Sequence, residues 1–291
     1  MRTALALLLV LAAACGPASS GADRISVLGV DRLSGELAAV EVELPGADLG
    51  AVRGPAGTLL VQGASPECGL RRKVNGALVA RTVRCVTLLG QYAALDRARQ
   101  FLLAAGAEAL PPAPVAADSA VPGLRYDAAT DSFALGDGPL RARVPGALNP
   151  GAVVRELARR QLRPLAESHP DEAEGIALFL GAAAASDPDY LAASEPGGDP
   201  TGRLDLSRPL PAAAPAAAAL AGALWAWADA TGDLVSSARA ALAASRAVDR
   251  AAPAGPDFVL SLVAAQHEGK ERDQACAVFR ARVTAPLAAC P

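Results

Sequence analysis

The residues whose types and spacing point most directly to chemistry form the run Arg155-Glu156-Leu157-Ala158-Arg159. On a helix, residues four positions apart lie on one face, so Arg155 and Arg159 would project together. Two histidines at this spacing can share a zinc ion, and a Glu directly after the first can activate the metal-bound water. A guanidinium has no lone pair to donate and stays positive, so it cannot ligate zinc and repels it. The run therefore has the spacing of a zinc site without its ligands.

Three stretches, in order, resemble zinc metallopeptidases of the gluzincin type, the broad thermolysin-like group. Residues 149–159 read Asn-Pro-Gly-Ala-Val-Val-Arg-Glu-Leu-Ala-Arg, the frame of family members with Asn-Pro-x-x-Val-Val-His-Glu-x-x-His. Residues 174–180 resemble the family's Glu-Gly-x-Ala-Asp helix, which supplies the third zinc ligand. Residues 222–225 resemble the downstream Ala-Leu-Trp-Asp helix, and residues 95–102 resemble the helix that precedes the catalytic unit.

The sequence departs from this family at the positions that would hold the metal. Arg155 and Arg159 stand where the family has two histidine ligands, and Leu178 stands where it has Asp. Glu156 remains at the general-base position and Glu174 at the third-ligand position. A base without metal-bound water has nothing to activate, so the resemblance implies a catalytically inactive fold with no metal and no cofactor. An active peptidase with a site rebuilt around the two carboxylates is the alternative.

The loss of the histidines predicts a specific contact. If the fold is kept, a helix at 151–167 faces a helix at 171–186, and Glu174 is directed into the former metal position. An unpaired buried carboxylate is unfavourable by several kcal/mol, and a guanidinium fork suits a carboxylate. We therefore predict that Arg155 or Arg159 places a guanidinium nitrogen within about 4 Å of a Glu174 oxygen.

The first residues have the layout of an export signal. One positive charge precedes an apolar core of about a dozen residues, too short to span a bilayer. The run Leu-Ala-Ala-Ala-Cys-Gly at 11–16 resembles the lipobox of bacterial lipoproteins, with Ala12 in place of the usual Leu. Cleavage without lipid attachment also fits. We predict a signal peptide at 1–14, lipid on Cys15 and a polar tether over 15–23, which together place the protein at the cell envelope.

The other four cysteines predict two disulfides. An even number suits an oxidising compartment, and sequence alone allows three pairings. We predict Cys68–Cys85 and Cys276–Cys290, because each pair lies within one local unit. Free buried thiols are the alternative.

Residues 24–90 are predicted to form a small β-rich part. Short extended runs separated by Gly and Pro occur at 25–28, 39–44 and 58–61. Asn75-Gly76 lies between two more such runs over 70–81, and Asn-Gly is the preferred sequence for a type I′ hairpin turn.

Residues 91–291 are predicted to form a degenerate metallopeptidase-like domain. A helix at 91–105 is followed by a Pro-rich linker or surface loop at 111–122 and by two short strands at 124–127 and 131–135. Further helices are predicted at 151–167, 171–186, 212–230, 233–247, 257–266 and 271–283, with an irregular connection at 195–211. The expected fold class is α+β, a small β-rich N-terminal part followed by a mainly α-helical gluzincin-like domain.

The remaining residues with chemical potential are predicted to be structural. His169 is expected in a surface loop before a helix N-cap at Asp171, and it lies far in sequence from His267. Trp225 and Trp227 are expected on different helix faces, as core and rim.

The composition argues against a nucleic-acid-binding protein. The formal net charge is −3, charges of both signs are interspersed and aromatic residues are few, so nothing resembles a nucleic-acid-binding face. We predict a non-enzymatic envelope lipoprotein that binds or scaffolds, attached to the membrane through Cys15 and engaging an unknown protein or peptide. An unrelated structural lipoprotein is the remaining alternative, in which the helices carrying Glu156 and Glu174 do not pack together.

Overall fold

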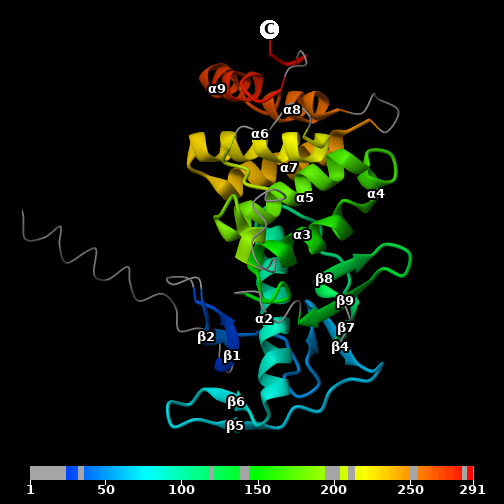
Figure 1. Ribbon diagram of the computed structural model, residues 1–291, viewed down its shortest axis with the longest axis vertical. Coiled ribbons are helices and arrows are strands. Elements are labelled where there is room, and N and C mark those ends of the chain that lie inside the picture. Colours follow the sequence, from blue (N-terminus) through cyan, green and yellow to red (C-terminus); the bar gives the residue numbers. More distant parts are fainter. Residues whose placement is uncertain are drawn as a thin grey trace, which may run out of the picture.

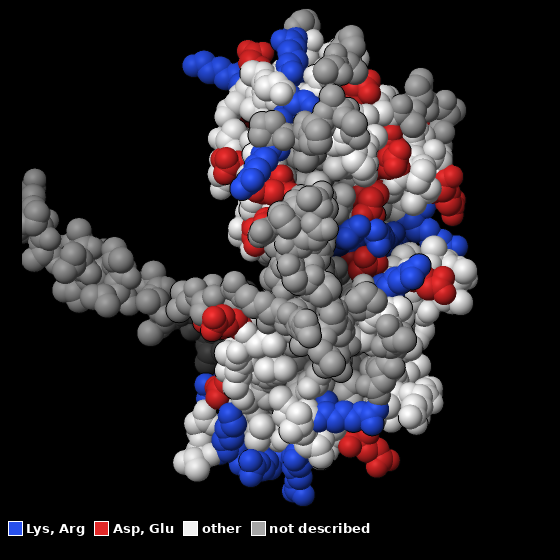
Figure 2. Space-filling model, viewed as in Figure 1, with Lys and Arg blue, Asp and Glu red and all other residues white. Residues whose placement is uncertain are grey.

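The computed structural model describes residues 24–31, 36–117, 121–137, 144–193, 204–208, 214–249, 255–283 and 287–290 of the 291-residue chain. The predicted signal peptide, Cys15 and the tether lie outside these ranges, as does most of the predicted connection at 195–211. Among the described elements, the strands gather at one end of an elongated molecule and the last helices at the other (Figure 1). Acidic and basic side chains are interspersed over the face drawn in Figure 2.

The first sheet has four strands in the order β2 (Leu37–Glu43), β1 (Arg24–Val30), β6 (Leu78–Ala80) and β5 (Leu70–Arg72). β1 pairs antiparallel with β2 and parallel with β6. The sheet packs through β1 against the long helix α2 (Val83–Ala104). The predicted strands at 25–28 and 39–44 are thus confirmed.

The second sheet has the order β3 (Arg53–Gly54), β4 (Gly57–Val61), β7 (Pro114–Ala117), β9 (Ser132–Asp137) and β8 (Pro122–Asp127). The predicted strands at 58–61, 124–127 and 131–135 are present. The prediction of a linker or surface loop at 111–122 is wrong for residues 114–117, because β7 lies between β4 and β9 and is parallel to both. Pro114 is the first residue of this strand, where a missing N–H is tolerated, and Val115 is fully buried.

β5 and β6 form the hairpin predicted over 70–81, but the predicted type I′ turn is wrong. Gly76 has a φ of 84°, whereas Asn75 is not among the residues with positive φ. The Gly76 N–H donates to the Lys73 carbonyl at 3.0 Å, and Asn75 Oδ1 accepts from the Ala77 N–H at 3.2 Å. The Asn75 side chain therefore closes a local turn of its own, and only the glycine adopts the left-handed conformation.

The helices after the second sheet are α3 (Pro150–Gln161), α4 (Arg163–Ala166), α5 (Pro170–Ala185), α6 (Ala216–Thr231), α7 (Leu234–Ala247), α8 (Pro256–Ala264) and α9 (Gly269–Arg280), with a 3₁₀ turn, η1 (Tyr190–Ala193). The single helix predicted at 151–167 is interrupted at Leu162, because Pro164 cannot donate the N–H that would continue it. None of the helices in the described part is both long and apolar enough to cross a membrane.

α5 is the central helix of the second half of the chain. It packs against α3 and also against α6, and Ile176, Phe179 and Leu180 are fully buried. A helix that is apolar on nearly every face, as α5 is, must be covered on all sides. The fold is α+β with a β-rich N-terminal part, as predicted. The expected boundary between residues 90 and 91 lies inside α2, and the second sheet takes strands from both sides of it.

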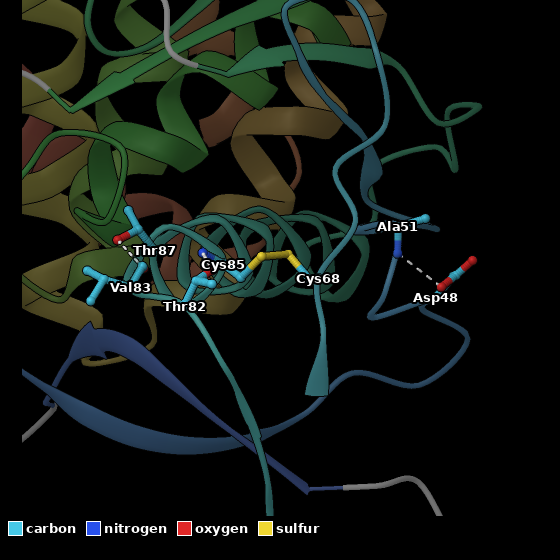
Figure 3. The surroundings of a disulfide bond; sticks show 7 residues. All are labelled: Asp48, Ala51, Cys68, Thr82, Val83, Cys85 and Thr87. Carbon is cyan, nitrogen blue, oxygen red and sulfur yellow. Dashed lines mark hydrogen bonds between the residues drawn. A yellow bond between two sulfur atoms is a disulfide. The ribbon is translucent and has the colours of Figure 1, made fainter. Parts of the chain in front are cut away.

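Both predicted disulfides are present, Cys68–Cys85 and Cys276–Cys290, with Cα separations of 5.6 and 5.5 Å. Cys85 lies in the first turn of α2, which begins at Val83 rather than at residue 91 as predicted. The Thr82 side chain caps this helix by accepting from the Cys85 N–H at 3.3 Å (Figure 3). The bridge therefore ties the segment before β5 to the start of α2.

Candidate functional site

The residues with the spacing of a zinc site lie on α3, whose start is set by Asn149 and Pro150. Asn149 Oδ1 accepts from the N–H groups of Gly151 (3.0 Å) and Ala152 (3.2 Å), which is an N-cap. Pro at the first helical position has a suitable φ and lacks only an N–H that the helix would not use. The Asn149 amide also donates to the Tyr190 carbonyl at 2.6 Å, so the helix start is fastened to η1.

Two arginines of α3 converge on one carboxylate of α5. Arg155 Nε lies 3.0 Å from Glu174 Oε1, and Arg159 Nε lies 2.7 Å from Glu174 Oε2. Arg155 Nη2 also contacts Glu174 Oε1. The predicted ion pair is therefore confirmed, and both arginines take part. We call Arg155, Glu156, Arg159 and Glu174 the ion-pair cluster.

Glu156 completes the cluster and is itself fully engaged. Its side chain is buried, Oε1 accepts from Arg159 Nη1 at 2.7 Å, and Oε2 accepts from the Tyr126 backbone N–H at 3.0 Å. The second bond joins α3 to strand β8. Glu156 therefore serves as a structural cross-link between α3 and β8, and each of its oxygens already accepts one hydrogen bond.

The charges of the cluster stabilise one another. Burial alone would raise the pKa of Glu174, but hydrogen bonds and charge from Arg159 and Arg155 outweigh it and hold the pKa below its usual value. Burial alone would lower the pKa of Arg159, yet the carboxylates of Glu174 and Glu156 raise it overall. The arginines therefore favour the charged carboxylate of Glu174, and the two carboxylates favour the charged guanidinium of Arg159.

Tyr190 closes one side of the contact between α3 and α5. Its ring lies against Gly151 of α3 and Gly181 of α5, where an added Cβ would come within 2.7 Å of ring atoms or of the facing helix backbone. These glycines are needed because no side chain fits between the two helices and the ring. Burial raises the pKa of Tyr190, so the phenol stays neutral. Its hydroxyl has no hydrogen-bond partner among the described atoms.

A further ion pair joins α3 to the hairpin of β8 and β9, and the sequence analysis did not find it. Arg160 Nε and Nη2 lie 2.8 and 2.7 Å from the two oxygens of Asp131, and the Tyr126 hydroxyl donates to Asp131 at 3.0 Å. The Arg160 side chain lowers the pKa of Asp131 to about 2. The only available sequence signal was an acidic residue in a turn, since the two residues are 29 positions apart.

The residues at this site do not fit the zinc ion that gluzincin-type peptidases hold. Arg155 and Arg159 cannot donate to a metal, and every carboxylate oxygen of Glu156 and Glu174 already accepts a hydrogen bond. Leu178, where the family has Asp, is buried in the core. Across the described ranges, no group of three or more His, Cys, Asp or Glu side chains could hold a metal ion.

The other residues singled out by sequence are structural, with corrections. His169 is buried instead of lying in a surface loop, and it, not Asp171, is the residue that precedes α5. Its Nδ1 lies 2.8 Å from the Ser168 hydroxyl. Trp225 and Trp227 are both buried, so the expectation that one lies at a rim is wrong. His267 packs edge-on against Trp227 with ring centroids 5.1 Å apart.

No protein-family model matches this sequence, and no curated protein matches it significantly. The likeness to gluzincin-type peptidases therefore rests on the motifs of the chain itself.

Proposed function

We propose that this chain is an exported lipoprotein of the cell envelope with a catalytically inactive, metallopeptidase-like helical unit, and that it binds or scaffolds a protein or peptide. The observation that carries the proposal is the ion-pair cluster. Arg155 and Arg159 occupy the two histidine positions of the motif and hold the carboxylate at the third-ligand position.

The cluster supports a non-catalytic role through its own chemistry. A peptidase of this type needs a Lewis acid, for which Arg155 and Arg159 offer no ligand. The candidate base, Glu156, is buried and held by Arg159 and by the Tyr126 N–H. The cluster instead joins α3, α5 and β8, which is what a metal cross-link would otherwise do. This structural use of the motif residues supports a binding role for the fold rather than peptide cleavage.

Restoring the histidines tests this proposal. In the double variant Arg155→His/Arg159→His, two imidazoles one helical turn apart should join Glu174 as zinc ligands. We expect one zinc per chain by elemental analysis, and we expect zinc to raise the melting temperature of this variant, since a ligand that binds only the folded state stabilises it. The unmodified chain should bind no stoichiometric zinc and cleave no peptide.

The matched control is the triple variant Arg155→His/Arg159→His/Glu174→Gln, which lacks the third ligand and should bind zinc more weakly. Circular dichroism confirms that each variant is folded before zinc is added. A folded double variant that takes no zinc, or a triple variant that binds zinc equally well, would refute the metallopeptidase-like arrangement.

The envelope location has its own test. Cys15→Ser removes the thiol that would carry lipid. After a high-salt wash, which screens attraction between surface cations and anionic lipid, the variant should therefore move from the membrane fraction to the soluble fraction of the producing cells, whereas the unmodified protein should stay with the membranes. Cys15→Ser leaves all four disulfide cysteines in place, so a change in fractionation cannot result from loss of a bridge. Unchanged fractionation, or an unmodified protein that is already soluble, would contradict the anchor.

A further inference from the structure

The hairpin of β5 and β6 carries an unusual concentration of positive charge for an acidic chain. Residues 67–85 contain five cationic side chains, against Glu67 as the single acid, whereas the whole chain has a net charge of −3. All five cationic residues are exposed: Arg71, Arg72, Lys73, Arg81 and Arg84. Figure 2 shows blue side chains gathered at the lower end of the molecule, the end where Figure 1 draws β5 and β6. We call this surface, together with Val74 and Val83, the basic hairpin end.

Exposed apolar side chains lie at both ends of this hairpin. Val74, at the hairpin tip, is fully exposed and Val83, at the start of α2, is 83% exposed. They are the two most exposed large hydrophobic residues in the described part of the chain. Each has one cationic neighbour in sequence, Lys73 before Val74 and Arg84 after Val83. An isolated exposed valine is ordinary, but two such residues among five cations form an amphipathic surface.

The fold holds this surface in place at both ends. At the tip, Arg24 Nη2 donates to the Asn75 carbonyl at 3.3 Å, and the Asn75 amide donates to Glu41 at 2.8 Å. At the open end, the Cys68–Cys85 disulfide ties the hairpin to α2. The tip is thus fastened to β1 and β2 while Val74 points into solvent.

We propose that the basic hairpin end docks on an anionic membrane surface, with its cations at the lipid headgroups and Val74 and Val83 entering the interface. Juxtamembrane cations are attracted to anionic lipid, and exposed apolar side chains between them gain by leaving water. Residues 67–85 contain no aromatic side chain, so the surface lacks the stacking groups that single-stranded nucleic acid would use.

The start of the chain favours the same partner, and here the inference rests on the proposed lipid anchor. Arg24 contacts the hairpin tip, and it follows Cys15 by nine residues. Nine residues of fully extended chain span at most about 30 Å. A lipid on Cys15 would therefore keep the basic hairpin end within about that distance of the bilayer, so that anchor and hairpin would engage the same membrane.

Vesicle binding tests the proposal independently of the anchor. The full chain carrying Cys15→Ser is mixed with phosphatidylcholine vesicles and with vesicles containing phosphatidylserine, and the ratio of the two affinities is measured. This ratio cancels any affinity of residues 1–23 that does not depend on lipid charge. We expect a preference for the anionic vesicles that falls as salt is raised. Arg71→Gln/Lys73→Gln should reduce the preference by roughly 30-fold, and Val74→Ser should weaken binding to both vesicle types.

The matched control, Lys270→Gln/Arg272→Gln, removes two exposed cations from α9 at the opposite end of the molecule. It should leave the preference unchanged. Equal binding to both vesicle types, or the same loss in the control, would overturn the proposal, as would tighter binding to single-stranded DNA than to anionic vesicles. These results do not depend on whether Cys15 carries lipid, so failure here is distinct from failure of the fractionation experiment.

Discussion

Loss of both disulfides should lower the free energy of unfolding by about 6 kcal/mol, because each closes a loop worth about 3 kcal/mol. The loops join cysteines 17 and 14 positions apart. A natural domain has only about 5–15 kcal/mol in total, so the chain that lacks both bridges should lose a large share of its stability. Urea denaturation of Cys68→Ala/Cys85→Ala, of Cys276→Ala/Cys290→Ala and of the quadruple variant measures these losses.

Cys15→Ser is the control for this experiment, since it removes a thiol that takes part in neither bridge, and it should leave the midpoint unchanged. The two bridges lie in separate regions, one at the start of α2 and one between α9 and the segment that follows it, so their effects should add within about 0.5 kcal/mol. A loss below about 1 kcal/mol for either pair would show that the bridge does not restrict the unfolded chain as expected.

Local patterns predicted much of the fold, and tertiary contacts explain the differences. Alternation and turn residues located the strands at 25–28, 39–44 and 58–61, and helical periodicity over 91–105 located most of α2. β7 was missed because its flanking prolines indicate a loop, whereas its pairing with β4 and β9 depends on residues more than 15 positions away in each direction. The early start of α2 was missed because the Thr82 cap precedes Val83 and Arg84, two exposed residues without an apolar pattern.

At the candidate site too, the sequence predicted some contacts, whereas others depend on tertiary structure. The contact between the arginines and Glu174 followed from a general requirement, that a partly buried carboxylate needs a positive partner. The hydrogen bond from β8 to Glu156 could not be predicted from the sequence, because its donor is a backbone N–H 30 residues earlier. The role of Tyr190 depends on two glycines that face each other only after α3 and α5 pack.

Glu174→Gln should lower the free energy of unfolding by about 2–3 kcal/mol at neutral pH, because it leaves Arg155 and Arg159 without their shared carboxylate. The side chains are about one-quarter to one-third exposed, so the effect should be smaller than for a fully buried pair. The amide has nearly the same shape as the carboxylate, so the loss reports charge and hydrogen bonding rather than packing. Chemical denaturation of both proteins at pH 7 measures the difference.

The stabilisation by Glu174 should depend on pH. Because the folded-state pKa of Glu174 lies below its ordinary value, the carboxylate stabilises the fold above the unfolded pKa of about 4.3, and this contribution is lost as pH falls through the lower, folded value. The difference in the free energy of unfolding between the unmodified protein and Glu174→Gln should therefore become smaller below about pH 4. Glu167→Gln is the control, since Glu167 makes only an exposed contact with Arg163 at 3.9 Å; it should change stability by less than about 1 kcal/mol at any pH. If the two variants behaved alike, the ion-pair cluster would not be what joins α3 to α5, and the packing of Tyr190 against the two glycines would have to account for that contact instead.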